Sequence, residues 1–428
     1  MIKSISAILL SVFVLALSYT YAQENQSTQT REKQEKKNIS EALIFATRPK
    51  GDFIFKVPPN RAVVHLSSTY YKNEHFSIYP IMINLADDAC QYNVEYSFKM
   101  VSPDGKENFV AKSKKMSGKL NNKGEFLFLP ENLRIVFENS DKFGKYNFVL
   151  SGKNLITNKS FEKTLTITLA EFPKTSAVAF TDKNEFDEVF KKYHTEQKPE
   201  TLRNLFASEH SQVFNQNGNL NYATLVFFRE AFREKPFLFD ILEEEFDTAT
   251  DSVRMKTILL FASLGENKRL AKKAMTQKEK TIFDNIFRLL ISIKSPYEEE
   301  SGLGAQDMLW GEFFAKGNYR PIEKMFSYLA DYDSAKKFFE RIKRGEKIDT
   351  KNEQQRKDAI KNARFLAAAF SLSSNLKVPL VASFADFYLS KNKEKFTIQN
   401  LKDAFTLLRE YSAFKREQAQ KQQSKKAN

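Results

Sequence analysis

The segment from Lys163 to Pro173, KTLTITLAEFP, marks the point at which the apolar spacing of this sequence changes. Within it, leucine and isoleucine alternate with threonine, which is the period of two expected for a strand with one buried face. Beyond Pro173 the apolar residues recur at every third or fourth position, as in residues 185–193, and this is the period of an amphipathic helix. The change predicts a β domain up to Phe172 and a helical domain after it.

The β domain is predicted to cover residues 42–172. The alternation is clearest from Tyr92 to Met100, and the turn residues Ser102-Pro103-Asp104-Gly105 follow it directly. Short strands separated by turns at such spacing favour an antiparallel β-sandwich. Further runs of this kind are 52–57, 62–66, 76–83, 126–129, 133–137 and 146–150.

The residues from Asp141 to Phe148 resemble the approach to a tyrosine corner in immunoglobulin-like (Ig-like) domains. In such a corner, a tyrosine at the start of a late strand donates a hydrogen bond to nearby backbone. Tyr146 takes that position here. The paired cysteines of antibody domains are absent, so the resemblance implies an Ig-like sandwich outside the antibody lineage.

The helical domain is predicted to cover residues 173–414, with Gly265 and Pro296 ending two of its helices. About a dozen helices of this length indicate an all-α array of stacked hairpins. The segment from Trp310 to Tyr319 resembles the first helix and tight turn of a tetratricopeptide (TPR) unit. No second copy lies 34 residues away, so the array is expected to be irregular and TPR-like in part. The predicted helices are 185–193, 199–206, 221–233, 236–246, 251–264, 278–294, 305–316, 321–330, 334–344, 352–372, 380–390 and 398–414.

The N-terminus has the pattern of a signal peptide. Lys3 precedes an apolar run from Ile5 to Leu17, and Thr20 and Ala22 occupy the positions expected at a cleavage site. We therefore expect residues 1–22 to be removed after Ala22; an uncleaved anchor is the alternative. Export to the periplasm of a bacterium follows from this expectation.

Two segments flanking the domains are predicted to be disordered. Residues 23–41 are polar and lack aromatics, which is typical of a linker. Residues 415–428 form a basic tail, interpreted either as a solvated helix end that runs into a loose segment or as an electrostatic tether. Its basic residues are Lys415, Arg416, Lys421, Lys425 and Lys426.

Composition limits the classes of function. The 428 residues carry a formal net charge of +14, but an exported protein seldom meets nucleic acid, so anionic envelope polymers or lipid head groups are the expected partners of this charge. A single cysteine excludes an intramolecular disulfide framework and a cysteine-based zinc cluster. The 40 phenylalanines must then supply stability through packing. Apart from the N-terminal run, the sequence lacks a long apolar segment, which makes any membrane association peripheral.

The familiar catalytic patterns are missing from this sequence. Its histidines are isolated and show no zinc-binding spacing, and there is no phosphate loop, dinucleotide fingerprint or nucleophile elbow. The acidic runs 243–245 and 298–300 place consecutive carboxylates in different directions on a helix, so they cannot converge as an acid and base. We therefore predict no catalytic residues, no metal and no cofactor. The histidines are His65, His75, His194 and His210.

Two strings resemble signatures of a group of uncharacterised exported bacterial proteins that pair a β-sandwich with a helical C-terminal region. They are DMLWGEFFAKG, from Asp307 to Gly317, and AFSLSSN, from Ala369 to Asn375. Phe370 stands where tryptophan is common in that group, and residues 377–379 replace an expected His-Pro step. The resemblance implies architecture and export, and it provides no catalytic residues.

Five residues of these strings and the adjoining turn are the candidate binding residues. An aromatic cluster beside a buried asparagine would form a groove for a peptide or a glycan. The alternative is that the aromatics pack the helical hairpin and that the asparagine ends a helix. The five are Asp307, Trp310, Phe314, Tyr319 and Asn375.

The function expected from the sequence is that of an exported, non-catalytic binding or scaffold protein of the bacterial cell envelope. Its partner would be an envelope protein or an anionic envelope polymer; the sequence leaves the oligomeric state open. One alternative is an envelope hydrolase that uses two carboxylates in an interdomain cleft. A second is electrostatic attachment to anionic polymer or lipid through the basic tail.

Overall fold

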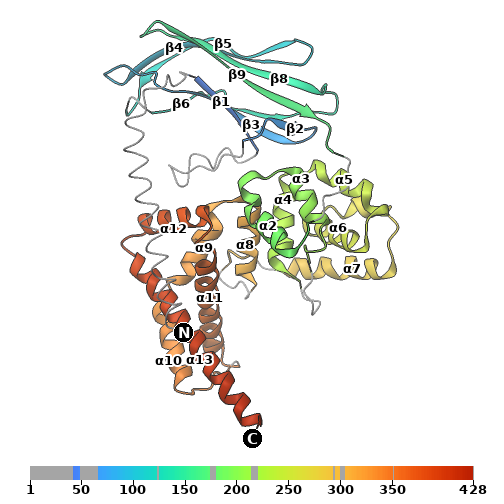
Figure 1. The fold of residues 1–428 in the computed structure, drawn as a ribbon, viewed down its shortest axis with the longest axis vertical. Coiled ribbons are helices and arrows are strands. Elements are labelled where there is room, and N and C mark those ends of the chain that lie inside the picture. The colour runs from blue at the N-terminus through green and yellow to red at the C-terminus, as the bar shows by residue number, and fades with distance from the viewer. Residues whose placement is uncertain are drawn as a thin grey trace. The chain divides into compact units, whose positions relative to one another are not determined.

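The computed structural model describes residues 42–48, 66–122, 125–173, 180–213, 220–292, 295–298, 304–349 and 351–427, without the side chains of 286–292, 422 and 425–427. An N-terminal region of sheets precedes a C-terminal region of helices (Figure 1). The predicted signal peptide and linker lie outside the described residues. The chain forms two compact units: the first comprises 1–44, 79–132 and 147–165, and the second comprises the remainder. The predicted division after Phe172 stays a prediction.

The described strands form two sheets. One sheet has the order β1-β3-β6, with β7 also paired to β3, and the other has the order β2-β9-β8-β4-β5. The period-two segments 76–83, 92–100, 146–150 and 164–169 correspond to β3, β4, β8 and β9, and 126–129 and 133–137 contain β6 and β7. The predicted segment 52–57 and residues 62–65 of the segment 62–66 lie outside the described residues. The strands are β1 Ala42–Thr47, β2 Thr69–Tyr71, β3 His75–Met82, β4 Gln91–Val101, β5 Glu107–Lys119, β6 Leu127–Phe128, β7 Leu133–Val136, β8 Gly144–Asn154 and β9 Lys159–Ala170.

The strands depart from the prediction in several ways, since β1 and β2, like β5, lie outside the predicted strand segments. β5 was not predicted because most of its side chains are exposed, so the sequence shows no apolar alternation there. β2 pairs with β9 in parallel, from Thr69 opposite Thr168 to Tyr71 opposite Ala170, so the sheets are not antiparallel throughout. This short strand lies at the edge of its sheet, where its partner on one side alone sets its direction.

The hydrogen bond predicted for Tyr146 is present. Its hydroxyl donates to the backbone oxygen of Lys142 at 3.0 Å, and its ring packs on Phe137 with 4.6 Å between the ring centroids. The predicted turn is also present, because Gly105 has φ of 81° and its N–H donates to Ser102 O. Both features were therefore predicted correctly from the local sequence.

The helical region follows the period of 3.6 closely. α6 and α8 have the predicted bounds, and Gly265 ends α6 in the left-handed conformation that glycine favours. The helices are α2 Lys183–Glu196, α3 Pro199–Ala207, α4 Tyr222–Arg233, α5 Phe237–Glu245, α6 Asp251–Leu264, α7 Gln277–Ser292, α8 Ala305–Lys316, α9 Tyr319–Leu329, α10 Tyr332–Lys343, α11 Glu353–Asn375, α12 Pro379–Lys391 and α13 Ile398–Ala427, with 3-10 turns at Phe246–Thr248 and Asn267–Leu270.

The predicted disorder of the C-terminal tail is wrong over residues 415–427. α13 continues through Phe414 to Ala427 without a break. The added residues are lysine, arginine, glutamate, glutamine, alanine and one serine, most of which are strong helix formers, and no glycine or proline interrupts them. A packed helix that is already nucleated extends at little cost through such residues.

α8 lies at the centre of the helical array. It packs against α4, α2, α9 and α11, with α2 to α7 on one side and α9 to α13 on the other (Figure 1). Gly311 makes the closest of these contacts possible. A Cβ atom there would lie 2.3 Å from the backbone oxygen of Ala223 on α4.

A buried lysine ties α6 to the end of α3. Lys256 is 4% exposed, and its Nζ donates to Ser208 O at 2.8 Å and to Ser211 Oγ at 2.7 Å. Among the described residues, no carboxylate forms an ion pair with this ammonium group. Burial lowers the pKa of Lys256 to about 8, and the nearby charge of Glu209 opposes this shift.

This lysine predicts a specific pH dependence of stability. Between pH 8 and about 10.5 the unfolded chain keeps the lysine proton while the folded chain has lost it, so the free energy of unfolding should rise with pH in that window. For Lys256 the rise amounts to about 3 kcal/mol. Buried Lys235, whose pKa is also lowered to about 8, contributes in the same sense. We expect Lys256→Met to flatten the rise in urea titrations at pH 7.5 to 10; equal slopes in the two proteins would contradict this.

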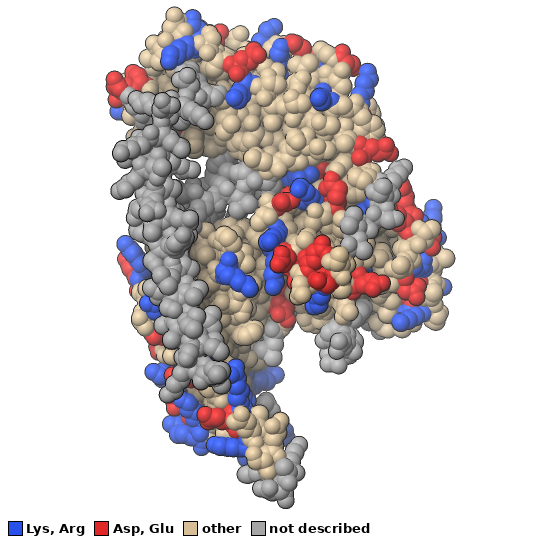
Figure 2. All heavy atoms as spheres, in the orientation of Figure 1, with Lys and Arg blue, Asp and Glu red and all other residues tan. Residues whose placement is uncertain are grey.

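Charges of both signs are interspersed over the helical region on the face drawn in Figure 2, so its positive charge is not gathered into one basic surface in that view. In the part of the chain that is described, no helix combines the length and the hydropathy required to cross a membrane.

Candidate functional site

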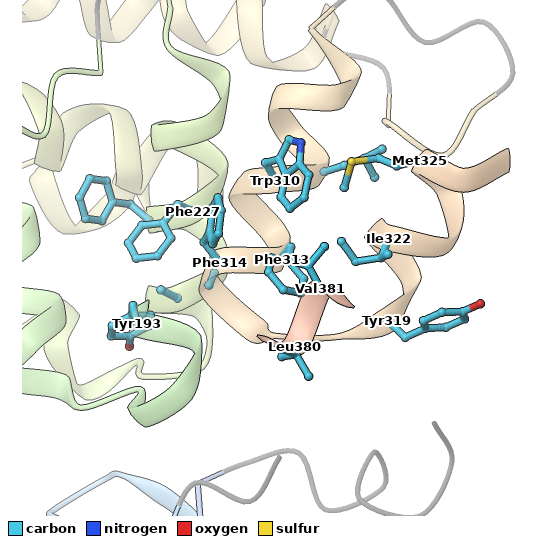
Figure 3. Packing of buried hydrophobic residues seen from close by; sticks show 14 of the residues in the cluster. Tyr193, Phe227, Trp310, Phe313, Phe314, Tyr319, Ile322, Met325, Leu380 and Val381 are labelled. Atoms are coloured by element: carbon cyan, nitrogen blue, oxygen red, sulfur yellow. The ribbon is translucent and has the colours of Figure 1, made fainter. Parts of the chain in front are cut away.

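The three aromatic candidates from the sequence are core residues. Trp310, Phe314 and Tyr319 are each 6% exposed or less, and Trp310 stacks on Phe314 with 5.5 Å between the ring centroids. Figure 3 shows Phe313 and Phe314 between side chains of α2 and α4 on one side and of α9 on the other. These rings pack the hairpin, which was the alternative to an aromatic groove.

The polar candidates do not join them. Asp307 is exposed on α8. Asn375 is the last residue of α11, and its Nδ2 donates to Ser371 O within the same helix at 2.9 Å. Of the basic tail, Lys415, Arg416 and Lys421 are exposed on α13, while the side chains of Lys425 and Lys426 are outside the described set.

A pocket of about 720 Å³ lies instead between α2 and the start of α12, within the second unit. This volume falls in the usual range for small-molecule sites. Its walls come from one face of α2 and from the turn that leads into α12. The lining residues are Asn184, Asp187, Glu188, Lys191, Lys192, His194, Thr195, Lys377, Val378, Pro379, Leu380 and Ser383.

The α2 wall is fixed at both of its ends. Asp182 caps the helix by accepting hydrogen bonds from the N–H groups of Asn184 and Glu185. Gln197 ends it with a φ of 50°, and its buried Nε2 donates to Ala315 O of α8 at 2.9 Å. The pocket wall is thereby tied to the central helix.

Two lining residues of the pocket, His194 and Leu380, lie against the turn between α8 and α9. Gly317 has a φ of 63°, and a Cβ atom there would lie 3.3 Å from both His194 and Leu380. The His194 ring, 1% exposed, packs on Phe313 with 5.1 Å between the centroids. The α8 string and the 377–379 segment, both noted in the sequence, therefore meet at this pocket.

The rim carries charges with different surroundings. Asp187 pairs with Lys183 at 3.0 Å, and Glu188 pairs with Lys192 at 3.6 Å, each four residues along α2. In the described part of the molecule, Lys191 and Lys377 form neither an ion pair nor a side-chain hydrogen bond. These two ammonium groups are thus available at the rim.

The first turn of α12 adds backbone donors. Val378 precedes the helix and provides no side-chain cap, and Pro379 occupies the first helical position. The N–H groups of Leu380 and Val381 have no partner within the helix, as at any helix start, whereas Ala382 N already donates to Val378 O. A partial positive charge therefore faces this end of the pocket.

A second polar cluster, which was not predicted, is buried in the second unit. Arg48 Nε donates to Glu74 Oε1 at 2.7 Å, and both side chains are at most 3% exposed. Glu74 Oε2 accepts from Tyr71 N, and the Tyr71 hydroxyl donates to Glu200. Lys235 lies nearby, with its Nζ 5.8 Å from the centroid of the Tyr193 ring. The residues are far apart in sequence, which is why no motif marks them.

The remaining chemistry is sparse. Among the described residues, no group of three or more histidine, cysteine, aspartate and glutamate side chains is placed to hold a metal ion. Sequence reasoning missed the pocket, although two signals pointed near it: the tight turn at Gly317 and the proline that starts α12.

Comparison with known proteins adds little. No family model matches the sequence, and no curated protein matches it at a significant level. One similar solved structure is a family 123 glycoside hydrolase from Clostridium perfringens, described in connection with glycolipid glycan hydrolysis. It is 10% identical, with a TM-score of 0.19; the match covers 47% of this chain and 36% of that one. A TM-score this low supports no conclusion about fold or function.

Proposed function

We propose that this chain is an exported, non-catalytic binding protein of the bacterial cell envelope and that a small ligand occupies the pocket between α2 and α12. The observation that carries the proposal is the pocket itself, whose lining combines the apolar residues Val378, Pro379 and Leu380 with charged residues of α2 and with Lys377. Pockets with an apolar lining and a few placed polar groups are typical of ligand sites.

Export enters the proposal from the sequence. The signal-peptide pattern of residues 1–22 supports it, as does the resemblance of the two strings to exported proteins. We further propose that the β region is Ig-like, which the Tyr146 hydrogen bond supports, and that α8 and α9 form a TPR-like hairpin, which the tight turn at Gly317 supports.

The hydrolase alternative finds less support at this pocket. Asp187 and Glu188 are adjacent on one helix, and each forms an ion pair with a lysine of the same helix. Such pairs are typical of a solvated helix face and do not set an acid against a base across a substrate. Electrostatic attachment through α13 is a separate hypothesis, which needs no pocket.

The proposal predicts that the purified protein retains a small molecule bound in this pocket. Protein purified from the envelope fraction of cells expressing the full chain should carry a small molecule detectable by native mass spectrometry. Thr195→Trp places a large side chain at the exposed wall of the pocket and should remove that molecule. The mass of the protein in the same spectra reports whether the chain begins at Met1 or at Gln23.

Thr406→Trp is the matched control. Thr406 is an exposed threonine on α13 whose hydroxyl, like that of Thr195, donates to a backbone oxygen of its own helix. The control should retain the ligand. Finding no bound molecule in the wild-type protein, or the same molecule in both variants, would refute the proposal.

A further inference from the structure

We infer that the ligand of the pocket between α2 and α12 is a soluble, single-chain amphiphile with an anionic head group, a carboxylate or a phosphate. The inference rests on the proposed function, since it names the ligand of the same site. Its basis is a pocket lining that combines two unpaired lysines with three apolar residues.

The rim favours an anion because its negative charges are already compensated and two of its positive charges are not. Asp187 and Glu188 are engaged by Lys183 and Lys192, one outside the pocket and one within it. Lys191 and Lys377 remain, one from each wall. A head group held between the two walls would contact both ammonium groups, and charge-assisted hydrogen bonds are the stronger kind.

The α12 start strengthens this preference. Lys377 stands two residues before Pro379, the first residue of α12. Val378, between them, provides no side-chain cap for the first turn of the helix. Backbone N–H groups and a helix dipole of this orientation bind carboxylates and phosphates elsewhere. The lysines and the helix end act on the same region of the pocket.

The apolar residues of the pocket favour a ligand that also carries a hydrocarbon chain. Val378, Pro379 and Leu380 line the pocket together with His194; Pro379 is exposed and Leu380 is 9% exposed. A hydrocarbon chain that covers these residues removes their apolar surface from water, which stabilises the complex by about 25 cal/mol for each Å² buried. An anion without an apolar part would leave that contribution unused.

Trp310 provides a reporter for occupancy. It is the sole tryptophan of the sequence, and it meets Phe313 edge to face at 5.7 Å, while Phe313 packs on the pocket residue His194. A ligand that contacts His194 is therefore separated from the Trp310 fluorophore by two aromatic contacts. Calorimetry supplies a second readout that does not depend on this path.

The test titrates the full chain with probes below their micelle-forming concentrations. Decyl phosphate and decanoate carry both features; decyltrimethylammonium and decyl maltoside carry the chain with a different head group; inorganic phosphate carries the charge alone. We expect decyl phosphate and decanoate to bind at least about tenfold more tightly than the other three, because each of them loses either the charge or the chain.

The variant Lys191→Gln/Lys377→Gln should lose roughly tenfold in affinity for decyl phosphate and little for decyl maltoside. Lys347→Gln/Lys395→Gln removes the same charge from exposed positions that do not line the pocket, and it should change neither affinity by more than about twofold. This control separates local contact from the overall field of the protein.

Three outcomes would overturn the inference while leaving the proposed function intact. In the first, all ten-carbon probes bind equally, so the head group plays no part. In the second, no probe binds although native mass spectrometry finds a molecule that Thr195→Trp removes. In the third, inorganic phosphate and decyl phosphate bind equally, so the ligand is not an amphiphile. Failure of both the probes and the native ligand experiment would refute the proposed function as well.

Discussion

Replacing Gly311 with alanine is expected to destabilise the second unit by about 3 kcal/mol or more. The added Cβ would lie 2.3 Å from Ala223 O and 3.0 Å from Phe227 N, both backbone atoms of α4. Neither atom can move away by a side-chain rotation, so the two helices must separate. α8 is the centre of the array, and their separation loosens the core on both of its sides.

From the sequence alone, one would expect Gly311→Ala to change the free energy of unfolding in the opposite direction. Alanine in a helix is intrinsically more favourable than glycine by about 1 kcal/mol, so propensity alone predicts stabilisation. The backbone clash at Gly311 outweighs that gain because packed interiors yield little. Urea denaturation followed through Trp310 fluorescence measures the difference directly.

Gly304→Ala, at the residue that precedes the same helix, is the matched control. A Cβ atom there would lie 2.9 Å from the Tyr222 ring, a side chain that is partly exposed and free to rotate. We expect a change of less than about 1 kcal/mol. If Gly311→Ala were as mild as this control, α4 and α8 would not approach as closely as described.

Removing the charge of Glu74 is the second large effect we expect. Glu74→Gln leaves the Arg48 guanidinium, 3% exposed, without its carboxylate, and it withdraws the charge that also offsets Lys235. Breaking a buried pair by removing one partner costs about 3–5 kcal/mol, because an uncompensated charge stays in a medium that solvates it poorly. Glutamine keeps an oxygen for the Tyr71 N–H, so the loss isolates the charge.

The double variant Arg48→Met/Glu74→Gln separates charge from packing. It removes one charge of each sign, so most of the stability lost in Glu74→Gln should return. A double-mutant cycle in urea gives the coupling between the two sites. Simple addition of the two single effects would show that the pair does not interact as its 2.7 Å separation implies.

The sequence predicted most of the secondary structure because its signals are local. The alternation from Tyr92 to Met100 follows from one buried strand face, and Gly265 ends α6 through its own φ. β5 escaped prediction because exposed lysines replaced the apolar alternation. The end of α13 escaped because a helix that packs at its start extends through residues that look disordered in isolation.

The candidate site was predicted only in part, for a related reason. Trp310, Phe314 and Tyr319 were predicted to form an aromatic binding groove, yet they are buried in the core and do not line the pocket. The ion pairs that Asp187 and Glu188 form within α2 likewise decide which lysines of the pocket remain unpaired.

The sequence by itself determined that strands precede helices, most of the helix boundaries, several of the strands and the signal-peptide pattern, since each depends on residues that are close together in the chain. The tertiary structure alone brought α2 beside the start of α12 and buried Arg48 against Glu74. These contacts join segments dozens to nearly two hundred positions apart, and pairing over such separations depends on packing throughout the core rather than on any local pattern of residues.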